Sequence, residues 1–274
     1  MLFFLLFLIS IPFLFLYGAY LIYGRNSLKA FYFNKVVYHN PIDKATYDKI
    51  NSLLSEQLHF FKQLTPEGKA KFIHRLLAFK NQKKFIGKEG CVVTEEMKII
   101  ISGAAIQLTF GLDQYLMDNI KGFFIYPSIF FNRMINQRLK GGTPPEGNMM
   151  LSWQHVEHGF VYPSDRYNLA LHEFAHALKS TITHANDFDM RFYDYLENWE
   201  AVGLLEFELM QHGDENFLRK YAGVNMHEFF AVCVEHFFEV PEQFHYNLPH
   251  IYFHLCVLLN LDPLNCSKDY LVER

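Results

Sequence analysis

The sequence predicts an α+β domain, dominated by helices and containing a small sheet, that is preceded by one N-terminal transmembrane helix. Three observations support this prediction. No charged side chain occurs before Arg25. Two short apolar and aromatic runs near turn residues indicate strands in the middle of the chain. After Asn168 the apolar residues recur at helical spacing almost to Leu261.

The composition narrows the classes of function. Of the 274 residues, 50% are hydrophobic and 17% are aromatic, a content that excludes an intrinsically disordered chain. The net charge of −4 is unsuited to general nucleic-acid binding, so we expect no nucleic-acid partner. The four cysteines are widely spaced and form no C-x-x-C pair, as is typical of a reducing compartment or of simple burial.

The first 24 residues are predicted to be a membrane anchor. As a helix, Met1–Tyr23 would be about 34 Å long, enough to cross a hydrocarbon core of about 30 Å. Tyr17, Tyr20 and Tyr23 gather at its C-terminal end, where aromatic rings suit the membrane interface. A cleaved signal peptide is disfavoured because the segment lacks an N-terminal Lys or Arg and an A-x-A site. We therefore expect an uncleaved anchor at residues 1–24.

The charges that follow the anchor predict its orientation. Arg25, Lys29 and Lys35 lie just after it, and only the α-amino group lies before it. The positive-inside rule then predicts a single-pass protein of the inner (plasma) membrane whose domain faces the cytoplasm. We expect a juxtamembrane segment at residues 25–50 and one domain at residues 51–274, since no shift in composition marks a second domain.

The first part of the domain is predicted to be helical. An amphipathic pattern covers Tyr47–Leu64. A second helix is expected after Thr65, where a threonine N-cap is followed by Pro66 and the acidic Glu67. A third helix is predicted to begin at Thr94 and to run to about Leu116.

Two strands and a long helical region are predicted to follow. Phe123–Phe130 and Met149–Val156 have the composition of short strands, and the glycines and prolines of residues 141–147 form the loop before the second strand. Residues 168–261 are predicted to form helices that are interrupted near Asn186, Gly213 and Pro241.

The most informative segment is Asn168–Leu178, NLALHEFAHAL, which contains an H-E-x-x-H motif. Residues four apart share one face of a helix, so His172 and His176 can reach a single zinc ion. Glu173 would then lie beside the water that a catalytic zinc activates, where a carboxylate can accept a proton. The other residues of the segment carry no charge, which suits a metal-bearing helix beneath a cleft.

A catalytic zinc usually has a third protein ligand, and two glutamates are candidates. Glu228 and Glu235 both lie in Met226–Glu239, a predicted helix. They are seven residues apart, so they share a helix face but are separated by roughly 10 Å, and only one of them can bind the metal. Tyr221 lies seven residues before Glu228 and could bring its hydroxyl to the same place. Spacing alone leaves both glutamates open.

The residues from about Phe60 to Pro263 resemble the Mlc titration factor A (MtfA) family of zinc peptidases, whose catalytic core resembles that of anthrax lethal factor. The resemblance covers some three quarters of the chain. The matching stretches are KKFIGKEGCVVTEEMKIIISGAAIQLTFGLDQY, IYPSIF, MLSWQHVEHG, NLALHEFAHAL and YAGVNMHEFFAVCVEHFFEVPEQF.

The resemblance implies a zincin-like metallopeptidase domain of the gluzincin type that holds one Zn²⁺. In the family, both histidines of H-E-x-x-H and the glutamate of the E-F-F-A segment bind the metal, which assigns His172, His176 and Glu228 as ligands. Glu173 is assigned as the general base. A tyrosine seven residues before the ligand glutamate assists catalysis in the family, which makes Tyr221 a donor to the developing oxyanion.

The resemblance therefore implies a membrane-anchored zinc metallopeptidase that hydrolyses peptide or protein substrates. The alternative is a non-catalytic zinc-containing regulatory protein that docks a transcriptional repressor or another cytoplasmic partner, since the family is best known for binding a glucose-responsive repressor. The complete set of base, ligands and tyrosine favours the enzyme. The chain departs from the family in two ways: Lys179 replaces the usual acid after HEFAH-x-L, and the predicted anchor is an addition.

Two further features of the second predicted strand have other interpretations. His155 and His158 could form a second metal pair, but on a strand they would point to different faces, so a polar strand end or cleft lining is favoured. If Met149–Val156 is the edge of a sheet above the active site, it could pair with an extended substrate.

Overall fold

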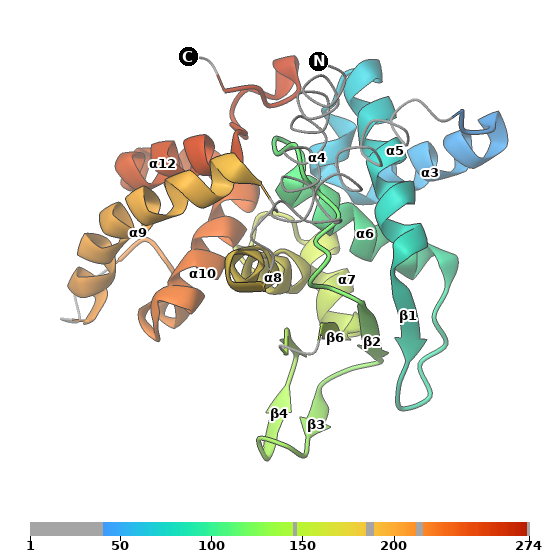
Figure 1. Ribbon diagram of the computed structural model, residues 1–274, viewed down its shortest axis with the longest axis horizontal. Helices are drawn as coiled ribbons and strands as arrows, with labels where there is room; N and C mark the ends of the chain where they lie inside the picture. The colour runs from blue at the N-terminus through green and yellow to red at the C-terminus, as the bar shows by residue number, and fades with distance from the viewer. Residues whose placement is uncertain (1–40, 145–146, 185–188, 212–215, 273–274) are drawn as a thin grey trace, which may run out of the picture.

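The structure is a computed structural model that describes residues 41–144, 147–184, 189–211 and 216–272. At its centre, helix α8 (Leu169–His184) packs between helix α6 (Glu95–Thr109) and helix α10 (Met226–Glu239), as Figure 1 shows. A small sheet lies below α8 in that view. The predicted helix-dominated α+β architecture with a small sheet is therefore confirmed.

The predicted membrane anchor at residues 1–24 lies outside the described residues, as does most of the predicted juxtamembrane segment at 25–50. Of the helices in the described part of the chain, none combines the length and the apolar character needed to cross a bilayer.

The first two predicted helices of the domain begin at or within three residues of their predicted starts. The pattern over residues 47–64 corresponds to two helices, α3 (Lys44–Gln57) and α4 (His59–Lys62). Helix α5 (Pro66–Gln82) follows its predicted N-cap, and the Thr65 hydroxyl accepts a hydrogen bond from the amide of Gly68 at 3.1 Å.

Helix α6 ends at Thr109, seven residues earlier than predicted. The chain turns at Gly111 because it passes against the end of the last long helix: a Cβ at Gly111 would lie 2.1 Å from the carbonyl oxygen of Asn260. Lys71 and Arg75, both on α5, donate hydrogen bonds to carbonyl groups around this turn. These hydrogen bonds satisfy the carbonyl groups that the end of α6 leaves free. Because they come from α5, the sequence around the turn does not reveal them.

The main sheet has the strand order β1-β2-β6-β5. Strands β1 (Lys84–Gly87), β2 (Gly122–Tyr126) and β6 (Asn148–Ser152) are parallel, and β5 (Gly141–Gly142) pairs with β6 in the antiparallel direction. The sequence missed β5, because a two-residue strand of glycines has the composition of a loop. It nevertheless forms one edge of this sheet, opposite β1.

The second predicted strand is shorter than expected, and its last residues are helical. The ladder between β2 and β6 ends with the pair Tyr126 and Ser152. Helix α7 (Trp153–Val161) then begins, and its buried residues Val156, Gly159 and Phe160 have helical spacing. The prediction of a strand over residues 149–156 was therefore wrong in its second half. It was also wrong about the edge, because β6 lies between β2 and β5.

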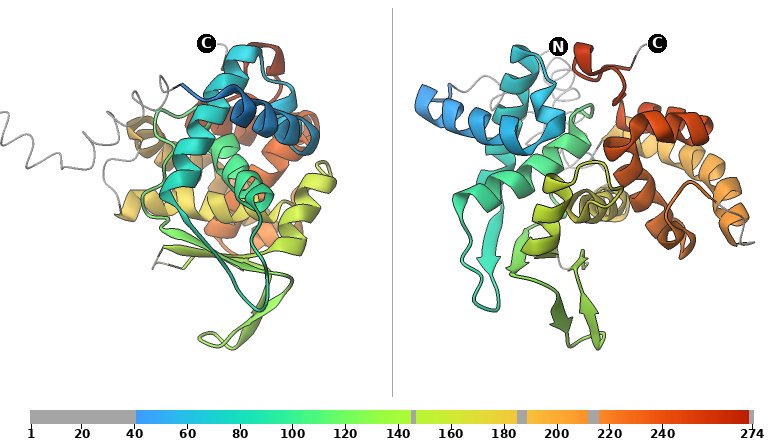
Figure 2. Two further views of the ribbon diagram at one scale, coloured as in Figure 1. Left: turned by 90° about the vertical axis from the view of Figure 1, so that its right-hand side faces the viewer. Right: turned by 180° about the vertical axis from the view of Figure 1, so that it is seen from behind.

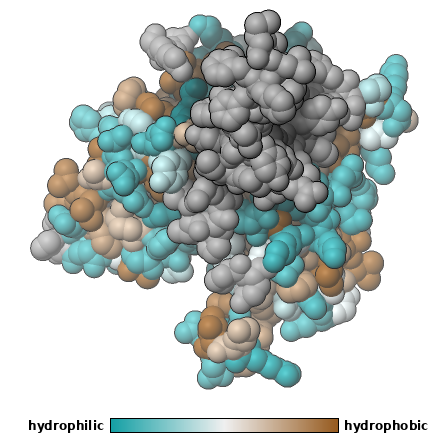
Figure 3. Space-filling view, in the orientation of Figure 1, coloured by the Kyte–Doolittle hydropathy of each residue, from teal (hydrophilic) through white to brown (hydrophobic). Residues whose placement is uncertain are grey.

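The first predicted strand is likewise divided. After β2, the chain forms a hairpin of β3 (Phe130–Asn132) and β4 (Gln137–Leu139), which projects from the domain in Figures 1 and 2. The tip of the hairpin exposes apolar side chains among polar ones: Met134 is 90% exposed and Ile135 is 53% exposed. It forms the brown and pale patch at the lower end of the space-filling view in Figure 3. The hairpin leads directly into β5.

The C-terminal half is helical, as predicted, and it forms one hydrophobic core with the N-terminal half. The Phe174 ring on α8 contacts those of Phe79 and Phe123, with ring centroids 6.1 and 5.9 Å apart. After α8 the helical elements are α9 (Met190–Gln211), η1 (Lys220–Gly223), α10, α11 (Pro241–Asn247), α12 (Pro249–Leu259) and η2 (Cys266–Lys268).

Candidate metal centre

Helix α8 brings the two histidines of the H-E-x-x-H motif together. The Nε2 atoms of His172 and His176 are 3.1 Å apart, and both side chains are largely buried. The residues on the inner side of this helix, among them Leu171, Ala175 and Leu178, have almost no exposed surface. Packing of this apolar face fixes the helix, so the two imidazoles are held in place by the core.

Glu228 reaches the same point from helix α10. Its Oε2 atom lies 3.0 Å from Nε2 of His172 and 3.4 Å from Nε2 of His176. The position of Glu228 is set by the start of the helix, because Oδ1 of the N-cap Asn225 accepts hydrogen bonds from the amides of His227 and Glu228. Two helices that are far apart in sequence thus direct three metal-binding atoms to one point.

The geometry of these three atoms fits a tetrahedral metal ion. Ligand atoms at about 2.0–2.1 Å from a tetrahedral zinc are about 3.3–3.4 Å from one another, close to the separations of 3.0–3.4 Å seen here. The Oε2 atom of Glu228 is buried and makes no hydrogen bond, although it lies beside two imidazoles. In the described part of the chain, His172, His176 and Glu228 are the only group of three or more such side chains with ligand atoms this close.

The charges of the site are strongly coupled. Burial lowers the pKa of His172, but the carboxylates of Glu228 and Glu235 raise it more, to about 10. Burial raises the pKa of Glu228, but the imidazoles of His172 and His176 lower it to well below its usual range. The group therefore favours a positive charge between its members, either a proton on an imidazole or a bound cation.

Glu173 is buried next to this group, with 5% of its surface exposed. Burial raises the pKa of its carboxyl group, and the neighbouring imidazoles offset part of that effect. The Thr143 hydroxyl donates a hydrogen bond of 2.9 Å to Oε2 of Glu173. Strand β5 also lies against the carboxyl group, since a Cβ at Gly141 would be 2.5 Å from Oε1. Only glycine allows the sheet edge to come this close.

Tyr221 lies on the open side of the group. It belongs to η1, and its ring centroid is 5.9 Å from that of His172. Half of its surface is exposed, so a bound molecule can reach it. Partial burial and the negative charge of Glu228 raise the pKa of the Tyr221 hydroxyl, so it stays protonated at neutral pH.

The structure separates the two glutamates that spacing left open. Glu235 approaches the other nitrogen of the same imidazole, with its Oε1 atom 2.8 Å from Nδ1 of His172. Its side chain is completely buried. The amide of Asn168 donates a 2.7 Å hydrogen bond to Oε2 of Glu235, and Arg219 forms an ion pair with Oε1. Glu228 and Glu235 thus flank His172 from opposite sides.

Sequence reasoning missed three residues of this site: Gly141, Thr143 and Arg219. The first two lie in a segment that was interpreted only as a loop, and no sequence signal places that loop beside Glu173. Arg219 lies two residues before Tyr221, and its charge close to the predicted catalytic tyrosine could have drawn attention to it. Lys179, which replaces the usual acid of the family, forms an ion pair with Glu200 of α9 at 2.5 Å.

His155 and His158 lie on helix α7 rather than on a strand. Nδ1 of His155 is 2.8 Å from the hydroxyl oxygen of Ser152, and Nδ1 of His158 is 3.5 Å from a carboxylate oxygen of Asp165. The strand argument made against a metal pair at these residues was therefore wrong. The two histidines instead contact residues at the two ends of α7.

Comparison with known proteins agrees with this geometry. The family described as glucose-regulated metallo-peptidase M90 matches residues 34–258, which is most of the chain. The chain belongs to this metallopeptidase family. A protein of Synechocystis described as uncharacterized is 28% identical over 234 residues, covering 78% of this chain and 85% of the relative. Mlc titration factor A of Yersinia pestis is 28% identical over 207 residues, covering 69% of this chain and 76% of the relative.

The family resemblance predicted from the H-E-x-x-H and E-F-F-A segments is therefore confirmed. Membership of a metallopeptidase family implies a bound metal ion. The group of His172, His176 and Glu228 has the ligand types and the separations that such an ion requires.

Proposed function

We propose that this protein is a zinc-dependent peptidase of the gluzincin type, with His172, His176 and Glu228 as the ligands of one Zn²⁺. The observation that carries the proposal is the convergence of two imidazole nitrogens and one carboxylate oxygen beside the buried carboxyl group of Glu173. When bound, zinc supplies Lewis-acid chemistry, since it polarises a carbonyl group and lowers the pKa of a water molecule.

Glu173 is the general base in this proposal. Its carboxyl group adjoins the ligand group, where it would accept a proton from the attacking water and later deliver it to the leaving amine. Burial raises its pKa, which brings its basicity nearer to the working pH. The hydrogen bond from Thr143 to Oε2 orients the carboxyl group and leaves Oε1 on the side of β5.

Tyr221 and Glu235 have different supporting roles. The exposed, protonated Tyr221 hydroxyl would donate a hydrogen bond to the oxyanion that develops on the scissile carbonyl. Glu235 accepts a hydrogen bond from Nδ1 of His172, which fixes the ring so that Nε2 faces the metal. Arg219 holds Glu235 in turn and immediately precedes η1, so it couples the position of Tyr221 to that of the ligand.

The substrate is proposed to be an extended peptide that pairs with strand β5. In the described part of the sheet β5 pairs only with β6, so its other side can accept a strand. Such a peptide would run past Glu173, because Gly141 touches its carboxyl group. This assignment moves the predicted substrate-pairing strand from Met149–Val156 to Gly141–Gly142.

The membrane anchor at residues 1–24 and a cytoplasmic domain remain part of the proposal. They are supported by the uncharged N-terminal run and by the basic residues that follow it. A reporter that is active only in the cytoplasm, fused after Arg274, should be active. A silent reporter, with the fusion protein present in the membrane fraction, would contradict this orientation.

A second candidate function is the docking of a regulatory protein. Relatives of this chain are named for titration of Mlc, which favours a regulatory partner for those proteins. In this chain such a partner would bind without being cleaved. Glu173→Gln separates the two functions, because it removes the base and leaves the three ligands and the outer surface unchanged.

The direct test is hydrolysis of a library of quenched fluorescent peptides by the full-length protein. We expect cleavage that stops when a zinc chelator is added and returns when zinc is restored. The purified protein should also contain about one zinc per chain. A protein that is loaded with zinc and folded, but cleaves no peptide while the chelator abolishes partner binding, would favour the docking function instead.

A further inference from the structure

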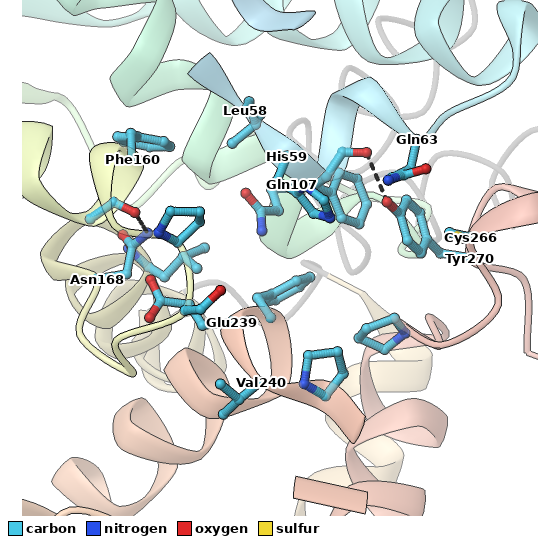
Figure 4. Close-up of a pocket in the computed structure, with 18 of the residues that line it drawn as sticks. Leu58, His59, Gln63, Gln107, Phe160, Asn168, Glu239, Val240, Cys266 and Tyr270 are labelled. Carbon is cyan, nitrogen blue, oxygen red and sulfur yellow. Dashed lines mark hydrogen bonds between the residues drawn. The ribbon is translucent and has the colours of Figure 1, made fainter. Parts of the chain in front are cut away.

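A partly open cavity with polar and apolar walls lies beside helix α8, and none of the residues of the metal centre line it. Its volume is about 420 Å³, which is in the range of small-molecule sites. Helices α4 and α6, the segment before α8, the junction of α10 with α11, and the C-terminal segment all contribute to its walls. Figure 4 shows Gln107 on one side of it and Glu239 on the other.

Glu239, the last residue of α10, is the unusual side chain of this cavity. Only 8% of its surface is exposed. The amide of Tyr167 donates a 2.9 Å hydrogen bond to Oε2, and the Asn168 side chain is a further polar neighbour of the carboxyl group. The buried Oε1 atom makes no hydrogen bond of ordinary geometry with the described residues. Burial, together with the negative charges of Asp165 and Glu235, raises the pKa of Glu239 to about 8. A buried carboxylate without a cation beside it is costly, so the side chain holds a proton near neutral pH, and a bound cationic donor would stabilise the ionised form instead.

The rest of the lining indicates the charge of the ligand. Among the described residues that line the cavity there is no lysine or arginine, and a second acid, Glu242, lies at its rim. An anionic ligand would therefore meet two acids and no lysine or arginine, with His59 as the one basic side chain in the described lining. Phe160, Phe238 and Tyr270 are among the lining residues, and aromatic rings attract organic cations. A metal ion is a poor match, since Glu239 belongs to no group of three closely spaced metal-binding side chains in the described chain.

We propose that this cavity binds a small organic molecule with a primary ammonium group, which donates a hydrogen bond to Oε1 of Glu239. The apolar part of the ligand packs against the aromatic walls. A bound ammonium group displaces the proton that the buried Glu239 otherwise holds near neutral pH, and the charge-assisted pair that results is stronger than a neutral hydrogen bond.

The cavity is connected to the metal centre through two adjacent backbone amides. The Tyr167 amide donates to Glu239, and the next amide, that of Asn168, donates to Glu235. Glu235 in turn contacts Nδ1 of His172. A ligand that changes the charge on Glu239 therefore acts on the residues that precede α8. If the proposed function is correct, occupancy of the cavity will alter zinc affinity.

The test uses three probes of the same shape and different charge: cyclohexylammonium, cyclohexanol and cyclohexanecarboxylate. Binding to the full-length, metal-free protein is measured by saturation-transfer NMR and calorimetry, so that the result does not depend on peptidase activity. We expect cyclohexylammonium to bind at least tenfold more tightly than either of the other probes. Equal or tighter binding of the alcohol or the carboxylate would overturn the proposal.

Two variants locate the site. Glu239→Gln keeps an oxygen that can accept from Tyr167 and should weaken cyclohexylammonium binding about tenfold or more. Glu242→Gln, at the exposed rim, is the matched control and should change it less than threefold. Unchanged affinity in Glu239→Gln would overturn the assignment. Zinc affinity with and without saturating cyclohexylammonium tests the connection, and identical values would exclude it while leaving the binding result in place.

Discussion

The two glutamates on α10 make the most decisive prediction, because each contacts a different nitrogen of His172. Glu228→Gln removes the negative charge that faces Nε2 of His172. The Oε2 atom of Glu228 at this position makes no hydrogen bond. In Glu235→Gln a charge is lost from the Nδ1 side, where the carboxylate contacts His172, Asn168 and Arg219. The proposed roles therefore predict opposite patterns for zinc affinity and for the stability of the metal-free protein.

The magnitudes follow from these contacts. Structural zinc sites with four ligands bind with about 10–16 kcal/mol, or about 2.5–4 kcal/mol for each ligand. Glu228→Gln should therefore weaken zinc binding by at least about 100-fold. Glu235→Gln should weaken it by about tenfold, because an amide oxygen still accepts from Nδ1. The same Glu235→Gln change should lower the free energy of unfolding of the metal-free protein by about 1.5–3 kcal/mol, since it breaks the buried ion pair with Arg219.

Zinc affinity is measured by competition with a chromophoric chelator, and stability by urea unfolding of the metal-free proteins. In Glu228→Gln we expect a large loss of zinc affinity and a smaller change in stability. A greater loss of zinc affinity in Glu235→Gln than in Glu228→Gln would refute the reasoning and move the third ligand to Glu235.

Four further predictions concern other residues of the two sites. Glu173→Gln should keep one zinc per chain but lower kcat by about 10²–10⁴-fold, and a variant with full activity would place the base elsewhere. Tyr221→Phe should lower kcat by about 10–1,000-fold with little change in KM, whereas a change in KM alone would make the residue a substrate-binding group. Gly141→Ala should impair hydrolysis and destabilise the fold by about 1–3 kcal/mol, because its Cβ would lie 2.5 Å from the carboxylate of Glu173. The matched Gly142→Ala, whose Cβ would first meet a methionine methyl group at 3.3 Å, should change stability by less than about 0.5 kcal/mol. The pKa of Glu239, raised to about 8 by burial, means that the folded protein holds a proton that the unfolded chain loses near pH 4.5. Stability should therefore fall as the pH rises from about 4.5 to 8, by about 3–5 kcal/mol from this group, and urea unfolding of Glu239→Gln should lack that part of the pH dependence.

The sequence by itself determined the features that depend on neighbouring residues. The N-cap at Thr65 and the start of α5 follow from contacts made within one helical turn. The H-E-x-x-H spacing places His172 and His176 on one helix face because both belong to the same helix. The family followed from the same local motifs, taken together with the E-F-F-A segment.

The tertiary structure decided the features that depend on packing between distant segments. Periodicity shows that Glu228 and Glu235 share a helix face, but only the position of α8 against α10 assigns them to opposite nitrogens of His172. The edge strand at Gly141 was invisible in the sequence, because its pairing with β6 and its contact with Glu173 leave no local pattern. The unpaired carboxylate oxygen of Glu239 is likewise a property of burial, which results from the packing of segments more than 70 residues apart in the chain.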